Sequence, residues 1–153
     1  MGELLGIPEW LAISVFVACG WIIWLSIGFI AHRRGQRRLA AKRPNPTREE
    51  FMGMLSDSVD EDIAVWLWDQ ALIYYDPLTP HPEDHLIRDA MIDDDDISMD
   101  WWPQFARANG LNKKAWPEWP QGWDLTARNY ARWLQLARNQ NLHPTQRQIP
   151  AGT

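Results

Sequence analysis

An uncharged stretch near the N-terminus constrains this chain more than any other feature. Residues 10–31 contain no Asp, Glu, Lys, Arg or His. Because a helix rises about 1.5 Å per residue, a stretch of this length is about long enough to cross a hydrocarbon layer of roughly 30 Å. The sequence therefore predicts one transmembrane helix at 10–31, preceded by a short extracytoplasmic N-terminus at 1–9.

The charges around the stretch and its length argue against two other interpretations. A cleaved secretory signal begins with positive charge and ends in small residues, whereas here Glu3 and Glu9 precede the stretch and Arg33 and Arg34 follow it closely. The core helix of a small soluble domain rarely stays uncharged over such a length. A single membrane anchor is the preferred interpretation.

The basic residues near the stretch predict its orientation. All of them follow it, and loops rich in Lys and Arg stay in the cytoplasm. We expect a single-pass protein of the inner (cytoplasmic) membrane, with the N-terminus outside and the C-terminal domain in the cytoplasm. Residues 32–46 form a basic juxtamembrane linker, and the four residues nearest the membrane are expected to contact anionic lipid headgroups. These four are Arg33, Arg34, Arg37 and Arg38; Lys42 and Arg43 follow.

The charge is divided sharply along the chain. Up to residue 44 there are six basic and two acidic residues, net +4, and the remainder has nine basic and eighteen acidic residues, net −9. An acidic domain is repelled by nucleic acid, so nucleic-acid binding is set aside. The only cysteine, Cys19, lies inside the predicted span, which excludes an intrachain disulfide or a Cys-based zinc site.

Residues 47–139 predict an all-α, acidic helical domain. Thr47 and Glu50 form a capping box that predicts a helix over 48–55, after Pro44 and Pro46 end the membrane helix. Ser58 and Glu61 repeat the pattern before a predicted amphipathic helix over 59–75. Its apolar face is formed by Val59, Ile63, Trp66, Leu67 and Tyr74.

The loop predicted over 76–85 contains two histidines four residues apart. His81 and His85 have carboxylates beside them, and such groups ligate metals. Pro82 opposes the helix that would align them, and the spacing fixes no third ligand, so a solvated loop is the simpler interpretation. The alternative function that these residues suggest is a metal-assisted hydrolase using His81, His85 and the run Asp93–Asp96.

The run Asp93, Asp94, Asp95 and Asp96 predicts the start of a helix over 96–109, because carboxylates are favourable ahead of a helix N-terminus. Gly110 would stop this helix. Pro103 either kinks the helix or restricts its regular part to a start near Trp102, after an irregular turn. The run lacks the ligand spacing of an EF-hand calcium loop.

The segment 89–97, with Phe105 and the pair Gly110 and Leu111 after it, resembles the central signature of a small bacterial domain family of unknown function related to acyl carrier proteins. The family pattern reads approximately Asp-Leu-Gly-Ile-Asp-Gly-Asp-Asp-Ala, and here Ala90 and Met91 replace its Leu and Gly. The resemblance covers about 57–135 and implies a compact helical bundle. Asp94 holds the place of the carrier serine, and Ser98 does not match it, so we expect no phosphopantetheine cofactor and no acyl carrier activity.

The domain is rich in tryptophan towards its C-terminal end. Residues 115–123 repeat a Trp-Pro pair and predict an extended strap whose indoles cover the bundle, with a partner-binding face as the alternative. Asp124 is expected to cap a last helix that runs to about 139 and buries a stripe formed by Ala127, Tyr130, Ala131, Leu134 and Ala137, joined by Trp133. The polar tail 140–153 is predicted to be disordered.

These features favour a non-enzymatic interaction module over an enzyme, because no nucleophile has a base placed beside it by the sequence. An adaptor, an immunity or inhibitor protein, and a subunit of a membrane assembly all belong to this class. Its partner is expected to be a protein, either basic or embedded in the membrane. The predicted partner-binding residues are Asp93, Asp94, Asp95, Asp96, Trp101, Trp102, Trp116 and Trp119.

Overall fold

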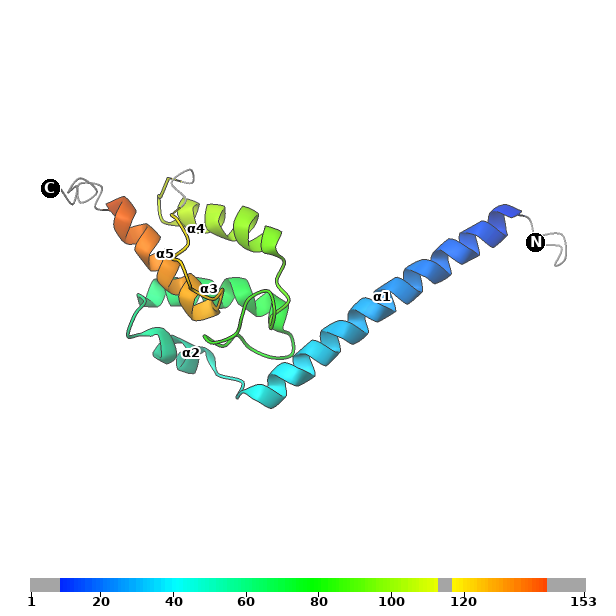
Figure 1. The fold of residues 1–153 in the computed structure, drawn as a ribbon, viewed down its shortest axis with the longest axis horizontal. Helices are drawn as coiled ribbons and strands as arrows, with labels where there is room; N and C mark the ends of the chain where they lie inside the picture. Colours follow the sequence, from blue (N-terminus) through cyan, green and yellow to red (C-terminus); the bar gives the residue numbers. More distant parts are fainter. Residues whose placement is uncertain (1–8, 113–116, 143–153) are drawn as a thin grey trace. The chain divides into compact units, whose positions relative to one another are not determined.

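The computed structural model describes residues 9–112 and 117–142, and within these ranges it is all-α. The chain divides into two compact units, Met1–Arg38 and Leu39–Thr153. The first contains most of helix α1, and the second is a globular unit built from the other helices (Figure 1). The expectations for the N-terminus at 1–8, for Trp116 and for the tail at 143–153 lie outside the described residues.

Helix α1 spans Glu9–Lys42. Among the described residues it is the one helix long and apolar enough to cross a membrane, and no part of its most apolar window is buried inside the structure. The helix continues through the basic residues, so most of the predicted linker 32–46 is helical. It ends just before Arg43 because Pro44 disfavours the helical conformation at the residue that precedes it.

Helices α2, Arg48–Leu55, and α3, Glu61–Tyr75, are the first two helices that lie wholly within the globular unit. The capping box is confirmed: the Thr47 hydroxyl accepts from the Glu50 amide at 3.2 Å, and the Glu50 carboxylate accepts from the Thr47 amide at 2.7 Å. The second capping box is wrong, because Asp60 is the N-cap of α3 and the Ser58 hydroxyl donates to Asp57. Helix α3 therefore starts two residues later than predicted.

The segment after the irregular loop begins with a π-helical turn, η1, over Asp96–Trp101, and continues as α4, Trp102–Ala108. The second of the two alternatives for Pro103 is thus confirmed, because the α-helix starts at Trp102 and Pro103 lies in its first turn. A proline is tolerated there because the amide it lacks has no helical partner. Gly110 follows with φ of 65°, a left-handed conformation that glycine adopts without strain.

Helix α5, Ala127–Leu142, closes the bundle against α3. Thr126 caps it through a hydrogen bond from the Asn129 amide to the Thr126 hydroxyl at 3.2 Å, so the assignment of the cap to Asp124 is wrong. The predicted stripe is confirmed, since each of its members is at most 2% exposed.

Aromatic side chains fill the space between α3, η1, α4 and α5. Trp101 lies 6.3 Å from Trp66 of α3 and 5.7 Å from Tyr130 of α5, between ring centroids. Trp102 lies 5.2 Å from Trp133. Edge and tilted contacts of this kind add to the hydrophobic burial of each ring. The core of the globular unit therefore depends on indoles supplied by the segment that follows the aspartate run.

The C-terminal turn of α1 and the residues after it belong to the globular unit. Leu39 is 3% exposed and is part of its core. Arg43 donates from Nε to the Asp84 carboxylate at 2.8 Å and from Nη2 to the Thr79 carbonyl at 2.9 Å. The side chains of Arg43 and Asp84 are 9% and 5% exposed, so this ion pair is buried. We call it the Arg43–Asp84 clasp.

Candidate functional site

The segment between Ala90 and Trp101 alternates between buried and exposed side chains. Ala90, Ile92, Ile97 and Trp101 are each at most 5% exposed and hold the segment against the core. Between these buried positions, Met91, Asp93, Asp94, Asp95, Met99 and Asp100 face solvent. We call these six residues the acidic–methionine surface.

The backbone of the segment is fixed by local hydrogen bonds. The Ile92 amide donates to the Leu86 carbonyl at 3.0 Å, and the Asp95 amide donates to the Asp93 carboxylate at 3.1 Å. Met91 adopts φ of 57°, in the left-handed region, which is unfavourable for a residue with a side chain. These hydrogen bonds therefore hold the exposed carboxylates on a turn of defined backbone conformation.

Asp96 differs from the three aspartates before it because it is only partly exposed. The Tyr74 hydroxyl of α3 donates to its carboxylate at 2.8 Å. Burial, together with this hydrogen bond and the negative charge of Asp96, raises the pKa of Tyr74 above its ordinary value. Asp96 thus connects η1 to α3, while its neighbours remain available to solvent.

Within residues 9–112 and 117–142, no cation forms an ion pair with the carboxylates of the acidic–methionine surface. None of the ion pairs found among the described residues involves Asp93, Asp94, Asp95, Asp96 or Asp100, whereas Arg43, Arg48, Arg128 and Arg138 each pair with carboxylates elsewhere in the globular unit. Met91 and Met99 are 47% and 70% exposed. Flexible, polarisable methionine side chains adapt to the shape of a partner. This combination of unpaired negative charge and exposed thioethers is suited to binding a basic surface.

Trp101 and Trp102 are not part of any such surface. They are 2% and 0% exposed, and their rings contact aromatic side chains of α3 and α5. Their predicted role in partner binding is corrected to a role in the core. The abundance of tryptophan in so small a domain predicts that several indoles form or cover its core, but nothing local indicates which of them the π-helical turn directs inward.

Trp119 and Trp123 cover the bundle, as the strap interpretation predicted. The Trp119 indole donates to the Trp123 carbonyl at 2.9 Å, and its ring lies 5.9 Å from that of Trp133. The Arg132 guanidinium lies over the Trp123 ring at 4.6 Å. These contacts leave Trp119 only partly exposed, so its main role is to cover the core.

The two histidines are used by the local backbone. Nδ1 of His81 accepts from the Glu83 amide, and Nδ1 of His85 accepts from the Arg88 amide, both at 3.2 Å. Burial lowers the pKa of His81 below its ordinary value despite the nearby charge of Asp84. Within residues 9–112 and 117–142, no three His, Cys, Asp or Glu side chains gather as metal ligands. The geometry therefore gives no support to the metal-assisted hydrolase.

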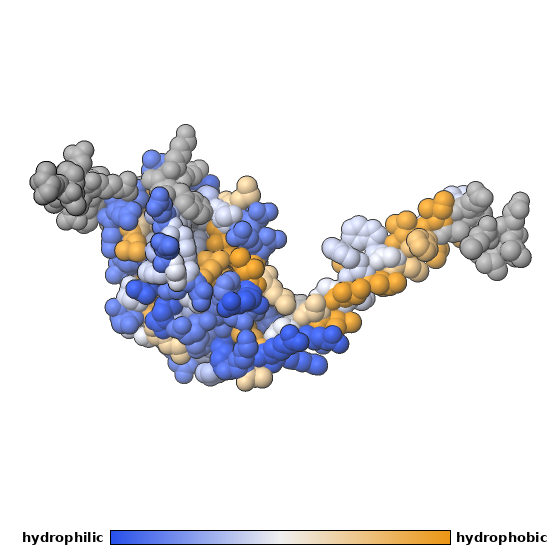
Figure 2. Space-filling view, in the orientation of Figure 1, coloured by the Kyte–Doolittle hydropathy of each residue, from blue (hydrophilic) through white to orange (hydrophobic). Residues whose placement is uncertain are grey.

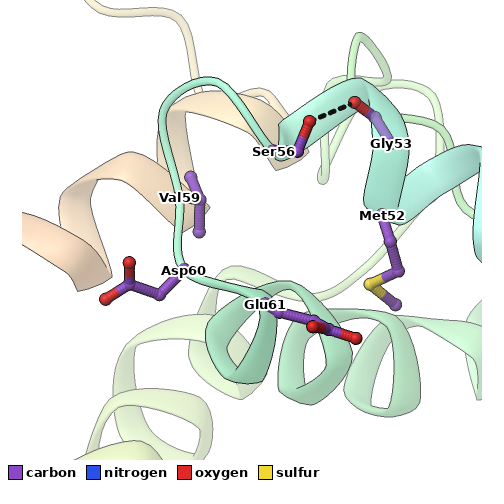
Figure 3. A pocket seen from close by; sticks show the side chains of 6 residues that line it. All are labelled: Met52, Gly53, Ser56, Val59, Asp60 and Glu61. Carbon is purple, nitrogen blue, oxygen red and sulfur yellow. Dashed lines mark hydrogen bonds between the residues drawn. The ribbon is translucent and has the colours of Figure 1, made fainter.

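A shallow hollow of about 350 Å³ lies where α2 ends and α3 begins (Figure 3). It is lined by Met52, Gly53, Ser56, Val59, Asp60 and Glu61. The carboxylates of Asp60 and Glu61 point in opposite directions, and Asp60 pairs with Arg138 of α5. Two carboxylates that diverge do not form an acid–base pair across a substrate, so the hollow offers no catalytic arrangement.

The sequence was compared with protein-family models, curated proteins and solved structures, and none of them matches it. The resemblance to the acyl-carrier-related family therefore stays a prediction.

Proposed function

We propose that this protein is a single-pass protein of the cytoplasmic membrane that presents an acidic helical domain to a basic protein partner in the cytoplasm. The observation that carries the proposal is the contrast between its two units. The most apolar window of α1 is not buried anywhere along its length, whereas the globular unit encloses its own aromatic core. An exposed apolar helix of this length is suited to a bilayer. The core of the globular unit is complete without the apolar residues of this helix, so another apolar environment must cover them.

The exposed arginines of α1 support the proposed orientation. Arg33, Arg34, Arg37 and Arg38 all have exposed side chains immediately after the apolar part of the helix. Each basic residue near an anionic leaflet contributes about 1 kcal/mol of attraction. The N-terminus then lies outside and the globular unit lies in the cytoplasm.

The chemistry of the acidic–methionine surface supports the choice of partner. Its carboxylates attract a basic protein over a distance of about one Debye length, roughly 10 Å at 0.1 M salt. Met91 and Met99 then supply apolar contact once the charges have met. Binding of this kind weakens as salt is raised.

The membrane location is tested by fractionation of the full-length protein with a C-terminal tag. We expect the protein in the membrane pellet after washing with alkaline carbonate, and we expect the tag to resist protease added to spheroplasts. Recovery of the protein in the soluble fraction would refute the membrane anchor. Digestion of the tag in intact spheroplasts would show that the C-terminal domain lies outside, contrary to the proposed orientation.

The partner-binding role is tested with two triple variants of equal charge change. The first replaces Asp93, Asp94 and Asp95 by Asn, which keeps an oxygen that accepts from the Asp95 amide. The matched control replaces three exposed carboxylates elsewhere by Gln: Glu49, Glu61 and Glu118. Both raise the net charge by three, so a purely long-range effect would be similar in the two.

The tagged proteins are captured from a detergent extract at low salt and washed with increasing salt. We expect a protein with a basic surface to accompany the wild type and the Gln control and to be lost from the Asn variant. Capture of the wild-type chain alone at low salt would refute the interaction role, and equal capture by both triple variants would refute the assignment to this surface.

A further inference from the structure

The four methionines in the described part of the chain form two pairs with different surroundings. Met52 and Met54 belong to α2 and are half-buried, and Met52 packs against the hydrophobic core. Met91 and Met99 lie on the acidic–methionine surface and are 47% and 70% exposed. Oxidants attack the thioether sulfur of methionine, and they must reach it from solvent. The pair on the acidic–methionine surface is therefore the more accessible to a dissolved oxidant.

The fold holds the side chain of Met91 outward. Its two neighbours in the chain, Ala90 and Ile92, are each 1% exposed. The Met91 amide donates to the Ile87 carbonyl at 3.1 Å, and the Ile92 amide donates to the Leu86 carbonyl at 3.0 Å. Turning Met91 into the core would break these hydrogen bonds and expose its buried neighbours. Its exposure is thus a property of the folded backbone.

The π-helical turn η1 holds Met99 outward in a similar way. Ile97 and Trp101, two positions before and after it, are 5% and 2% exposed. The Ile97 amide also donates to the Asp93 carbonyl at 3.2 Å, which fixes the start of the turn. Met99 therefore lies on the solvent side of a turn that is anchored in the core at both ends.

Oxidation of the exposed pair should leave the globular unit folded. Neither Met91 nor Met99 belongs to the hydrophobic core. The face of the globular unit visible in Figure 2 is largely hydrophilic, with smaller hydrophobic areas, so polar groups on the surface of this unit are already the rule. A sulfoxide is polar, and at Met52 it would place a polar group against the core, which is unfavourable without a hydrogen bond. Hydrogen peroxide carries no charge, so the carboxylates of the surface do not repel it.

We propose that Met91 and Met99 are a site of reversible oxidation by hydroperoxides, and that their oxidation releases the basic partner of the acidic–methionine surface. An electron pair of the thioether sulfur attacks one oxygen of hydrogen peroxide, and the O–O bond breaks as the S–O bond forms. The hydroxyl left on sulfur gives its proton to the departing hydroxide, which leaves as water. The sulfur is oxidised to a sulfoxide and the peroxide is reduced.

The reverse step requires a thiol-dependent reductase. Two thiols are oxidised to a disulfide, the sulfoxide oxygen leaves as water, and the thioether is restored; separate reductases act on the two epimers of the sulfoxide. The proposed cytoplasmic location exposes the site to such enzymes. The release of a partner rests on the proposed function, whereas the selective oxidation of Met91 and Met99 does not depend on it.

The sulfoxide changes one part of the surface and leaves the other intact. The flexible, apolar thioethers that adapt to a partner become polar, while the carboxylates keep their charge. We expect affinity for a basic amphipathic partner to fall about tenfold, because the apolar contact of two partly covered methionine side chains is lost. The dependence of binding on salt should stay the same, because no charge has changed.

Selective oxidation is tested on the full-length protein in detergent, treated with a limited amount of hydrogen peroxide. Mass spectrometry of its peptides locates the added oxygen atoms. We expect Met91 and Met99 to be oxidised well before Met52 and Met54, and to be restored by methionine sulfoxide reductases of both epimer classes with a dithiol. Tryptophan fluorescence should stay unchanged. Oxidation of Met52 and Met54 first, or of all four at one rate, would overturn the site.

Release is tested with an immobilised synthetic helix of lysine and leucine as the basic amphipathic probe. The double variant Met91→Leu with Met99→Leu keeps apolar side chains of similar volume but has no sulfur there, and Met52→Leu with Met54→Leu is its matched control. Peroxide should weaken binding about tenfold in the wild type and in the control, and should have no effect on the first variant.

A further double variant, Met91→Gln with Met99→Gln, imitates the uncharged, polar sulfoxide and should bind the probe weakly without peroxide. Equal loss of binding in all variants after peroxide, or none in the wild type, would overturn the release step. Failure of the untreated wild type to bind the probe would refute the acidic–methionine surface and the release together, while the peptide masses would still decide whether Met91 and Met99 are the oxidation site.

Discussion

Replacing Arg43 by Ala tests whether the Arg43–Asp84 clasp stabilises the globular unit. The substitution leaves the Asp84 carboxylate, 5% exposed, without its cation. The Thr79 carbonyl also loses the hydrogen bond that it accepts from Arg43. Removing one partner of a buried ion pair costs about 3–5 kcal/mol, because the remaining charge stays away from water without compensation. For a small domain this is a large part of the total free energy of unfolding.

The assay is urea unfolding of a fragment comprising residues 39–153, followed by tryptophan fluorescence. The matched control is Arg48→Ala, which breaks the pair between Arg48 and Asp69. That pair has the same chemistry, but its side chains are 46% and 57% exposed and its closest atoms lie 3.4 Å apart. Exposed pairs contribute about 0–1 kcal/mol, so the control should lower the free energy of unfolding only slightly.

A double variant distinguishes the unpaired charge from simple loss of packing. Arg43→Met with Asp84→Leu replaces both charges by apolar groups, and we expect it to recover much of the stability lost in Arg43→Ala. A loss below about 1 kcal/mol in Arg43→Ala, equal to that of Arg48→Ala, would refute the reasoning, because burial would then confer no special cost. A double variant as unstable as the single one would show that the uncompensated carboxylate is not the cause.

Four further predictions concern single side chains of the globular unit. The Tyr130 hydroxyl is buried and has no hydrogen-bond partner in the described structure, so Tyr130→Phe should leave the urea midpoint unchanged or raise it. Met91→Gly should stabilise the fragment by up to about 1 kcal/mol in the same assay, because glycine tolerates the positive φ of 57°. Burial alone would raise the pKa of Asp89, but the His85 amide and the Lys42 ammonium outweigh burial, and the pKa is lowered overall. Asp89→Asn should therefore lower the free energy of unfolding at pH 7, and this loss should become smaller as pH falls through the pKa that Asp89 has in the folded protein. Burial lowers the pKa of His81, so protonation of its imidazole favours the unfolded state. The free energy of unfolding should therefore decrease as pH falls below 6.5, the ordinary pKa of histidine, and this decrease should be smaller in His81→Gln than in the wild type.

Local patterns predicted the helices well where the residues that cap a helix lie close together in the sequence. Thr47 and Glu50 are three residues apart, and the helix begins where their capping box placed it. The stripe of α5 follows directly from helical periodicity. The caps at Ser58 and Asp124 failed because Asp60 and Thr126, both polar residues two positions further on, compete for the same role, and only packing decides between them.

Contacts between distant residues had no such signal. Arg43 and Asp84 are separated by 41 positions, and nothing near either residue indicates that they form a buried pair. The inward orientation of Trp101 and Trp102 depends on α3 and α5 lying on either side of η1 and α4. The run Asp93–Asp96 was predicted to precede a helix, and the π-helical turn η1 does begin at its last member, Asp96.

The structure divides the six basic residues after the span into two groups with separate consequences. Lys42 and Arg43 pair with Asp89 and Asp84 within the globular unit, while Arg33, Arg34, Arg37 and Arg38 keep exposed side chains. Replacing these four arginines by Gln should therefore weaken or reverse the orientation of the protein, measured by protease access to a C-terminal tag, because charge flanking the span directs insertion. The same four substitutions should leave the urea midpoint of the globular unit unchanged.

The reverse result is expected for Arg43→Ala in the full-length protein. Its globular unit should unfold at lower urea, while the tag stays protected, because four of the five arginines after the span remain in place to direct insertion. Loss of orientation in Arg43→Ala, or loss of stability in the four-arginine variant, would contradict this division. Basic residues next to a membrane span thus cannot all be counted as lipid contacts, since a folded domain that begins within the same helix takes the last of them into its own ion pairs.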